Sequence, residues 1–62
     1  MIVQFVDSVA GTPIYINPAL VISFRPDPEE PTRVTLMKLS DGEAIRVIGD
    51  HEEVANRLSR RP

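Results

Sequence analysis

The dipeptide Asp41-Gly42 constrains the fold of this chain more than any other feature of the sequence. It separates two runs in which apolar and polar residues alternate, 32–39 and 44–48. Asp-Gly between such runs predicts a two-residue β-hairpin, because a type I′ turn needs positive φ at both central residues. This hairpin turn fixes the pairing register of the two strands, and the register decides which side chains share a face of the sheet.

The length of 62 residues allows one domain, so we expect residues 1–62 to form a single small β-rich domain. A chain of this size buries only about 60% of its unfolded surface and usually needs a disulfide, a metal or self-association. The sequence has no cysteine and only one histidine, His51, which excludes disulfides and disfavours a zinc site. Self-association is the remedy that remains, and we therefore predict a homo-oligomer.

The N-terminal segment indicates the compartment. No basic residues precede the first apolar run, 2–6, and that run is too short for a signal peptide or a membrane span. We expect a cytoplasmic protein without membrane insertion. The net charge of −2 gives no overall attraction for nucleic acid, so such binding would depend on a local patch.

Five short strands are expected, because alternating runs are separated by glycine and proline residues. They are predicted at 2–6, from 14 to 16, and at 20–25, 32–39 and 44–48, with an acidic, proline-rich loop at 26–31. The predicted fold class is mainly β (α+β), a small antiparallel sheet of about five strands with one C-terminal helix.

The helix is expected to begin after Gly49, where the apolar period changes. Asp50 can cap its first turn, with Glu53 three residues later in the capping-box position. Basic residues follow near its end, where they suit the helix dipole; these are Arg57, Arg60 and Arg61.

The expected register defines two faces. Centring a hairpin on the 26–31 loop places Phe24 opposite Val34, and the Asp41-Gly42 turn places Leu36 opposite Val47 and Met37 opposite Arg46. The core face would then carry Leu20, Ile22, Phe24, Val34, Leu36 and Val47, with Val54 and Leu58 of the helix above it.

Three apolar residues fall on the second face, which is more than a solvated face needs. We predict that they form an oligomer interface; they are Val21, Met37 and Ile48. The alternative is that they are scattered surface hydrophobes, which are common on soluble proteins.

The same face carries three arginines. Arg25, Arg33 and Arg46 form a candidate patch for an anion or an acidic partner, with Arg25 directly opposite Arg33. The alternative is that acidic residues of the 26–31 loop neutralise them as surface ion pairs.

No arrangement of nucleophile, base and orienting residue is visible in the sequence. His51 is interpreted as an exposed residue at the helix start, and the three glycines lie at turns or at the helix boundary rather than in a phosphate-binding loop. We therefore expect a non-enzymatic protein without catalytic residues, cofactor or metal.

The order of motifs resembles the FlbD-like family of small flagellar and swarming-motility proteins. The matching stretches are Met1-Ile2, Gly11, Ile16-Asn17, Val21-Ile22, Thr32 to Leu36, Asp41-Gly42, Val47 and Glu53-Val54. This resemblance implies a cytoplasmic, non-enzymatic accessory to flagellar function, and it brings no catalytic residues.

The chain also resembles the carbon storage regulators, small RNA-binding proteins with five strands and a C-terminal helix that form intertwined dimers. The stretch His51 to Val54 is similar to the start of their helix. Their basic first strand is not matched, since Gln4 stands where an arginine-containing run is expected. A post-transcriptional RNA-binding regulator is therefore the alternative function.

Overall fold

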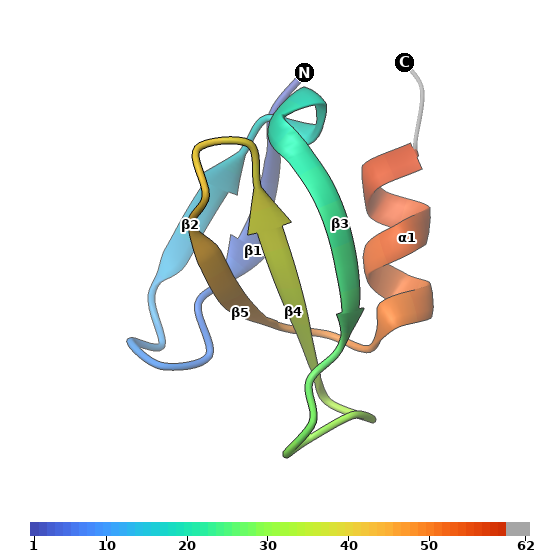
Figure 1. The fold of residues 1–62 in the computed structure, drawn as a ribbon. Coiled ribbons are helices and arrows are strands. Elements are labelled where there is room, and N and C mark those ends of the chain that lie inside the picture. The colour runs from blue at the N-terminus through green and yellow to red at the C-terminus, as the bar shows by residue number, and fades with distance from the viewer. Residues whose placement is uncertain (60–62) are drawn as a thin grey trace.

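The computed structural model describes residues 1–59 as two antiparallel sheets and one helix (Figure 1). The strands β1 (Val3–Val6) and β2 (Pro13–Ile16) form one sheet, and β3 (Val21–Pro26), β4 (Val34–Leu39) and β5 (Ala44–Ile48) form the other in that order. A 3₁₀ turn, η1 (Pro18–Leu20), connects the sheets, and α1 (His51–Ser59) follows β5. The predicted fold class is confirmed. Arg60 and Arg61 lie outside the described residues.

The loop between β4 and β5 is one residue longer than predicted. The N–H of Gly42 donates to the carbonyl of Leu39 at 3.0 Å. Gly42 has a φ of +93°, whereas no described non-glycine residue, Asp41 included, has positive φ. The type I′ prediction is therefore wrong. Residues 40–42 form the three-residue loop in which a turn is followed by a glycine bulge.

The longer loop moves β4 by one position against β5. Leu36, rather than Met37, pairs with Arg46, and Val47 pairs with Thr35 rather than with Leu36. Because side chains alternate between the two faces, a slip of one residue exchanges the faces of β4. Met37, which was expected on the second face, is therefore fully buried on the core side, as is Thr35.

The register of β3 against β4 also differs from the prediction. Phe24 pairs with Met37 rather than with Val34. The loop between the two strands forms its own hydrogen bonds, so Arg33 lies in a turn before β4 begins. The predicted pair of Arg25 and Arg33 does not form for this reason.

One apolar core joins the two sheets and the helix. It contains Val3, Phe5, Ile16, Met37, Val47 and Val54, with Ile14, Val21, Phe24, Leu39, Ile45 and Leu58 packed against it. Leu20 and Ile22 are exposed, contrary to the prediction. The register of β3 shifts between Val21 and Ser23, so Ile22 lies at a bulge and points away from the core.

The helix α1 stands next to β3, on the opposite side of the molecule from β2 (Figure 1). It starts as predicted, because the Asp50 carboxylate accepts the N–H of Glu53 at 2.8 Å. Val54 is fully buried and Leu58 packs against the core. A helix of nine residues is marginal alone, so these contacts hold it in place.

No helix among residues 1–59 has the length and apolar character needed to cross a membrane.

Candidate functional site

The three residues predicted to form an oligomer interface do not share a surface. Met37 is fully buried, Val21 packs against the same core, and Ile48 is exposed. The slip in register is the cause, since it moves Met37 from the face that was assigned to Ile48 to the other side of the sheet. Met37 cannot contact another protein while the chain is folded, so we withdraw this surface as a candidate interface.

The predicted arginine patch is also divided. Arg25 and Arg46 lie on one face, on either side of Leu36, as the pairing shows. Arg33 lies in the loop and pairs with the carboxylate of Glu30 at 3.1 Å. Arg46 is paired as well, so Arg25 alone among the three has no ion-pair partner within residues 1–59.

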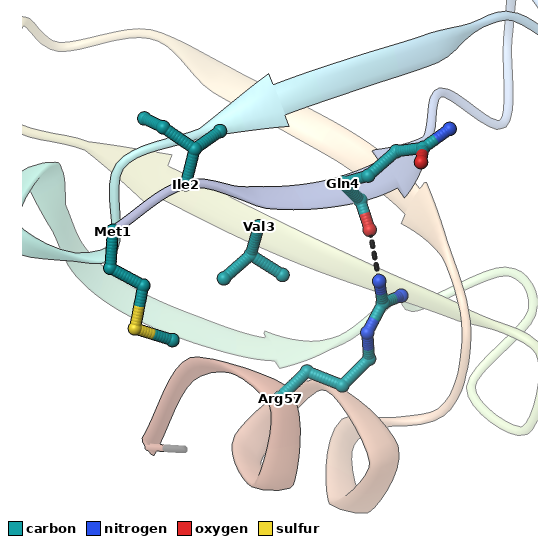
Figure 2. Close-up of a pocket in the computed structure, with 5 residues that line it drawn as sticks. All are labelled: Met1, Ile2, Val3, Gln4 and Arg57. Atoms are coloured by element: carbon teal, nitrogen blue, oxygen red, sulfur yellow. Dashed lines mark hydrogen bonds between the residues drawn. The ribbon is translucent and has the colours of Figure 1, made fainter. Parts of the chain in front are cut away.

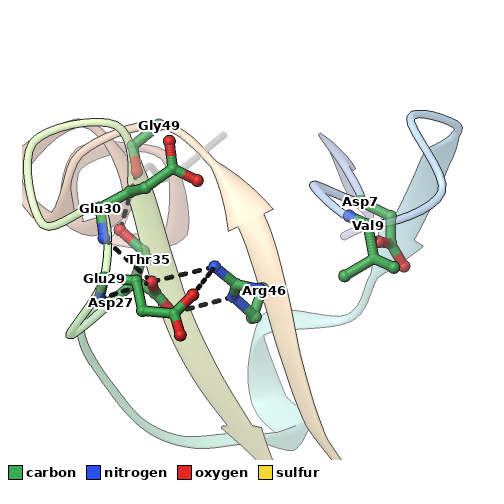
Figure 3. A network of polar contacts seen from close by, with 8 residues as sticks. All are labelled: Asp7, Val9, Asp27, Glu29, Glu30, Thr35, Arg46 and Gly49. Atoms are coloured by element: carbon green, nitrogen blue, oxygen red, sulfur yellow. Dashed lines mark hydrogen bonds and ion pairs between the residues drawn. The ribbon is translucent and has the colours of Figure 1, made fainter.

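The carboxylate of Asp27 organises the loop between β3 and β4 (Figure 3). Its two oxygens accept hydrogen bonds from Nε and Nη2 of Arg46 at 2.9 and 3.0 Å. Oδ2 also accepts the N–H groups of Glu29 and Glu30 at 3.0 and 3.1 Å. Asp27 is only 3% exposed. Arg46 supplies the opposite charge that a buried carboxylate requires, in a two-pronged geometry.

These contacts keep both groups charged. The hydrogen bond from Arg46 lowers the pKa of Asp27; burial opposes this shift, and the N–H groups of Glu30 and Glu29 reinforce it. The same hydrogen bond raises the pKa of Arg46. Since two donors of Arg46 already point at Asp27, this arginine serves to hold the loop. The loop therefore neutralises Arg46 and Arg33 but not Arg25, so the alternative in the sequence-based interpretation holds for two of the three arginines.

The outer side of the three-stranded sheet, which we call the basic face, carries the cations of this region. Alternation from the observed pairs places Ser23, Arg25, Val34, Leu36, Lys38, Ala44, Arg46 and Ile48 there, and of these Val34 is buried. A shallow hollow of about 260 Å³ lies at its edge, lined by Asp27, Pro28, Glu29, Leu36 and Arg46. The arginine of this hollow is the one already bound to Asp27.

The outer side of the two-stranded sheet, which we call the uncharged face, is different. Val3 and Phe5 point inward, so the alternate residues point outward, and the pairing sets Gln4 beside Tyr15 and Val6 beside Pro13. The face consists of Ile2, Gln4, Val6, Pro13 and Tyr15, none of which carries a charge.

Large apolar side chains of the uncharged face are open to solvent. Tyr15 is 65% exposed, Ile2 is 61% exposed and Val6 is 36% exposed. Figure 2 shows Ile2 and Gln4 pointing away from α1, on the side opposite Val3. This face was not among the surfaces predicted from the sequence. The signal was present in the run 2–6, where apolar residues occupy both alternating sets of positions.

A small hollow of about 210 Å³ adjoins the uncharged face, lined by Met1, Ile2, Val3, Gln4 and Arg57 (Figure 2). The guanidinium carbon of Arg57 lies 4.6 Å from the ring centre of Phe5, and Arg57 donates a hydrogen bond to the backbone carbonyl of Gln4. Arg57 thus satisfies a β1 carbonyl where no neighbouring strand reaches it, and it ties α1 to β1.

Residues 1–59 contain no group of three or more His, Cys, Asp or Glu side chains placed to hold a metal ion. No protein-family model, curated protein or solved structure matches the chain. The resemblances to the flagellar family and to the RNA-binding regulators therefore rest on the sequence pattern alone.

Proposed function

We propose that this protein is a non-enzymatic interaction module that acts by binding a protein surface. The uncharged face supports this proposal, because it leaves Ile2 and Tyr15 more than half exposed on one side of a small sheet. Apolar side chains gathered on one face of a monomer mark contact sites for other proteins. Tyrosine is also among the residues enriched in such contacts.

The setting that we propose is a cytoplasmic accessory role in flagellar function or swarming motility. Its support is the resemblance in motif order to the FlbD-like family, from Met1-Ile2 to Glu53-Val54. In this role the protein would act through its contacts and would carry out no reaction.

A motility assay tests the proposal. The gene is deleted in the source bacterium, and the strain is complemented with the wild type, with Tyr15→Glu or with Lys38→Glu. Lys38 is the matched control, because it is exposed on the basic face. We expect the deletion to reduce spreading on swarm plates, and we expect the wild type and Lys38→Glu, but not Tyr15→Glu, to restore it at equal protein levels.

Two results would count against the proposal. Normal spreading of the deletion strain would refute the motility role. Full restoration by Tyr15→Glu would refute binding through the uncharged face. A circular-dichroism melt of each purified variant separates a lost contact from a lost fold.

The RNA-binding alternative has less support. Arg33 and Arg46 are engaged by Glu30 and Asp27, so within residues 1–59 the basic face offers only Arg25 and Lys38 to phosphate groups. We therefore keep protein binding as the proposal.

A further inference from the structure

We infer that the uncharged face is the contact between two copies of this chain, related by a two-fold axis. This inference rests on the proposed interaction role and names the partner and the geometry. The self-association expected from the length of the chain would then occur on the two-stranded sheet, and not on the three-stranded sheet where the sequence analysis placed it.

The charge distribution favours a second copy as the partner. In a two-fold contact the same patch faces itself, so every charge on it meets a like charge nearby. The side chains of the uncharged face bring no charge to such a contact, and the cation Arg57 lies in the hollow at its edge, where it is bonded to the carbonyl of Gln4. The basic face would bring Arg25 and Lys38 against their own copies, and like charges directly opposed are destabilising. A highly charged partner would find no opposite charge on the uncharged face.

The arrangement of residues is also compatible with a two-fold axis. Gln4 and Tyr15 pair at the centre, with Ile2 two positions to one side and Val6 two positions to the other. Two positions along a strand span about 7 Å. An axis that crosses the strands at this central pair lays Ile2 over Val6 of the partner subunit and Val6 over Ile2 of the partner subunit.

The central pair, Gln4 and Tyr15, can form hydrogen bonds across this contact. The Tyr15 hydroxyl can donate and accept, and the Gln4 amide can do both as well, so each finds a partner across the axis. Facing sheets pack about 10 Å apart, which suits side chains of this length. The centre is therefore hydrogen-bonded and the two ends are apolar.

The size of the face limits the affinity. The monomer exposes 4265 Å². A stable interface takes about 800 Å² from each partner, roughly a fifth of that surface. Two four-residue strands cover about 13 by 10 Å, so the face supplies only part of that area. We therefore expect a weak dimer that is in reversible exchange with the monomer and forms as the concentration rises toward millimolar.

The test measures molecular mass by sedimentation and by light scattering as the purified chain is concentrated from micromolar to millimolar. We expect the wild type to pass from monomer to dimer, and Ile2→Glu and Val6→Lys each to weaken the dimer by about tenfold or more. The double variant Ile2→Glu with Val6→Lys should regain at least part of this loss, because the new charges of opposite sign face each other across the axis. Lys38→Glu, on the basic face, is the control and should not change the association.

The outcomes separate this inference from the proposed function. A wild type that stays monomeric at millimolar concentration overturns the dimer, and the swarming assay with Tyr15→Glu still tests the interaction role. A dimer that is insensitive to both single variants also overturns the inference, since the contact would then lie elsewhere. A double variant that associates no better than either single variant overturns the two-fold geometry.

Discussion

The two sheets of this protein share one core but present opposite kinds of surface on their outer sides. The basic face mixes cations with apolar residues, and the loop beside it is held by Asp27 and Arg46. The uncharged face has no charged residue, and Tyr15 and Ile2 extend from it into solvent. The helix α1 packs against the core through Val54 and Leu58, and it leaves the uncharged face exposed.

The largest effect that we expect is the difference in stability between a charged substitution in the core and one on the uncharged face. Met37→Glu would place a carboxylate in the core, at a cost of several kcal/mol. A chain of 62 residues has a total stability of about 3–9 kcal/mol, so this variant should be unfolded. Tyr15→Glu should change the free energy of unfolding by about 1 kcal/mol or less.

Urea unfolding followed by circular dichroism checks this pair of variants. A folded Met37→Glu chain would show that Met37 is not in the core, and the register described above would then be wrong.

The next effect concerns the loop beside the basic face. Asp27→Asn keeps the shape of the side chain but leaves Arg46 with only the exposed carboxylate of Glu29 as a counter-charge, 3.7 Å away, so the midpoint of thermal unfolding should fall clearly. The exposed ion pair of Arg33 and Glu30 is the control, and Glu30→Gln should have little effect because it is open to solvent.

The carboxylate of Asp27 should also make the stability of the fold depend on pH. The pKa of Asp27 is lower in the folded chain than in the unfolded chain. The contribution of ionised Asp27 to the stability of the folded chain is therefore complete above the unfolded pKa of about 3.9. It is lost as the pH falls through the folded pKa. Thermal melts from pH 7 downward should show this loss in the wild type, and the loss should be smaller in Asp27→Asn. Parallel curves for the two proteins would contradict the assignment.

A smaller effect compares one turn from each sheet. Gly42 and Gly11 have φ of +93° and +73°, and a Cβ at either position would meet no atom within 4 Å. Valine at either site should therefore cost about 1–2 kcal/mol through backbone strain alone. Thermal melts of Gly42→Val and Gly11→Val measure how much stability each turn loses, and so compare the two hairpins. A Gly42→Val melt equal to that of the wild type would mean that this turn is placed wrongly.

The smallest effect that we expect is RNA binding by the basic face. Arg25 and Lys38 are its cations without an ion pair among residues 1–59. Two phosphate contacts give a slope of only about −1.4 in log K against log of the salt concentration for a single strand. Fluorescence anisotropy with a labelled RNA should show no tight complex at physiological salt. A nanomolar complex that is lost in Arg25→Ala would restore the RNA-binding alternative.

The strands and the helix were predictable because their signals are local. The runs around β4 and β5 alternate, and Asp50 caps the helix three residues before Glu53. The register was not predictable, because Asp41-Gly42 suits both a two-residue and a three-residue loop, and the choice depends on burying Met37 rather than Leu36. The contact between Asp27 and Arg46 joins residues 19 positions apart, which no local pattern reveals.

The interaction surface was misplaced for the same reason. Once the register of β4 slipped by one residue, Met37 changed sides and the predicted interface lost its central member. The uncharged face does not depend on that register, because β1 belongs to the other sheet. Its apolar residues at both alternating positions of 2–6 could have been recognised in the sequence.

The hydrogen bond from Arg57 to the carbonyl of Gln4 connects residues 53 positions apart, which has a consequence during synthesis. A ribosome adds about 5–20 residues per second, so β1 exists for about 3 to 10 seconds before Arg57 has even been incorporated. When β1 leaves the ribosome, Phe5 has neither the arginine nor the helix over it, and the nascent strand is open to chaperones and to aggregation. Nascent chains arrested before Arg57 should therefore be cut readily by protease, whereas released chains should resist.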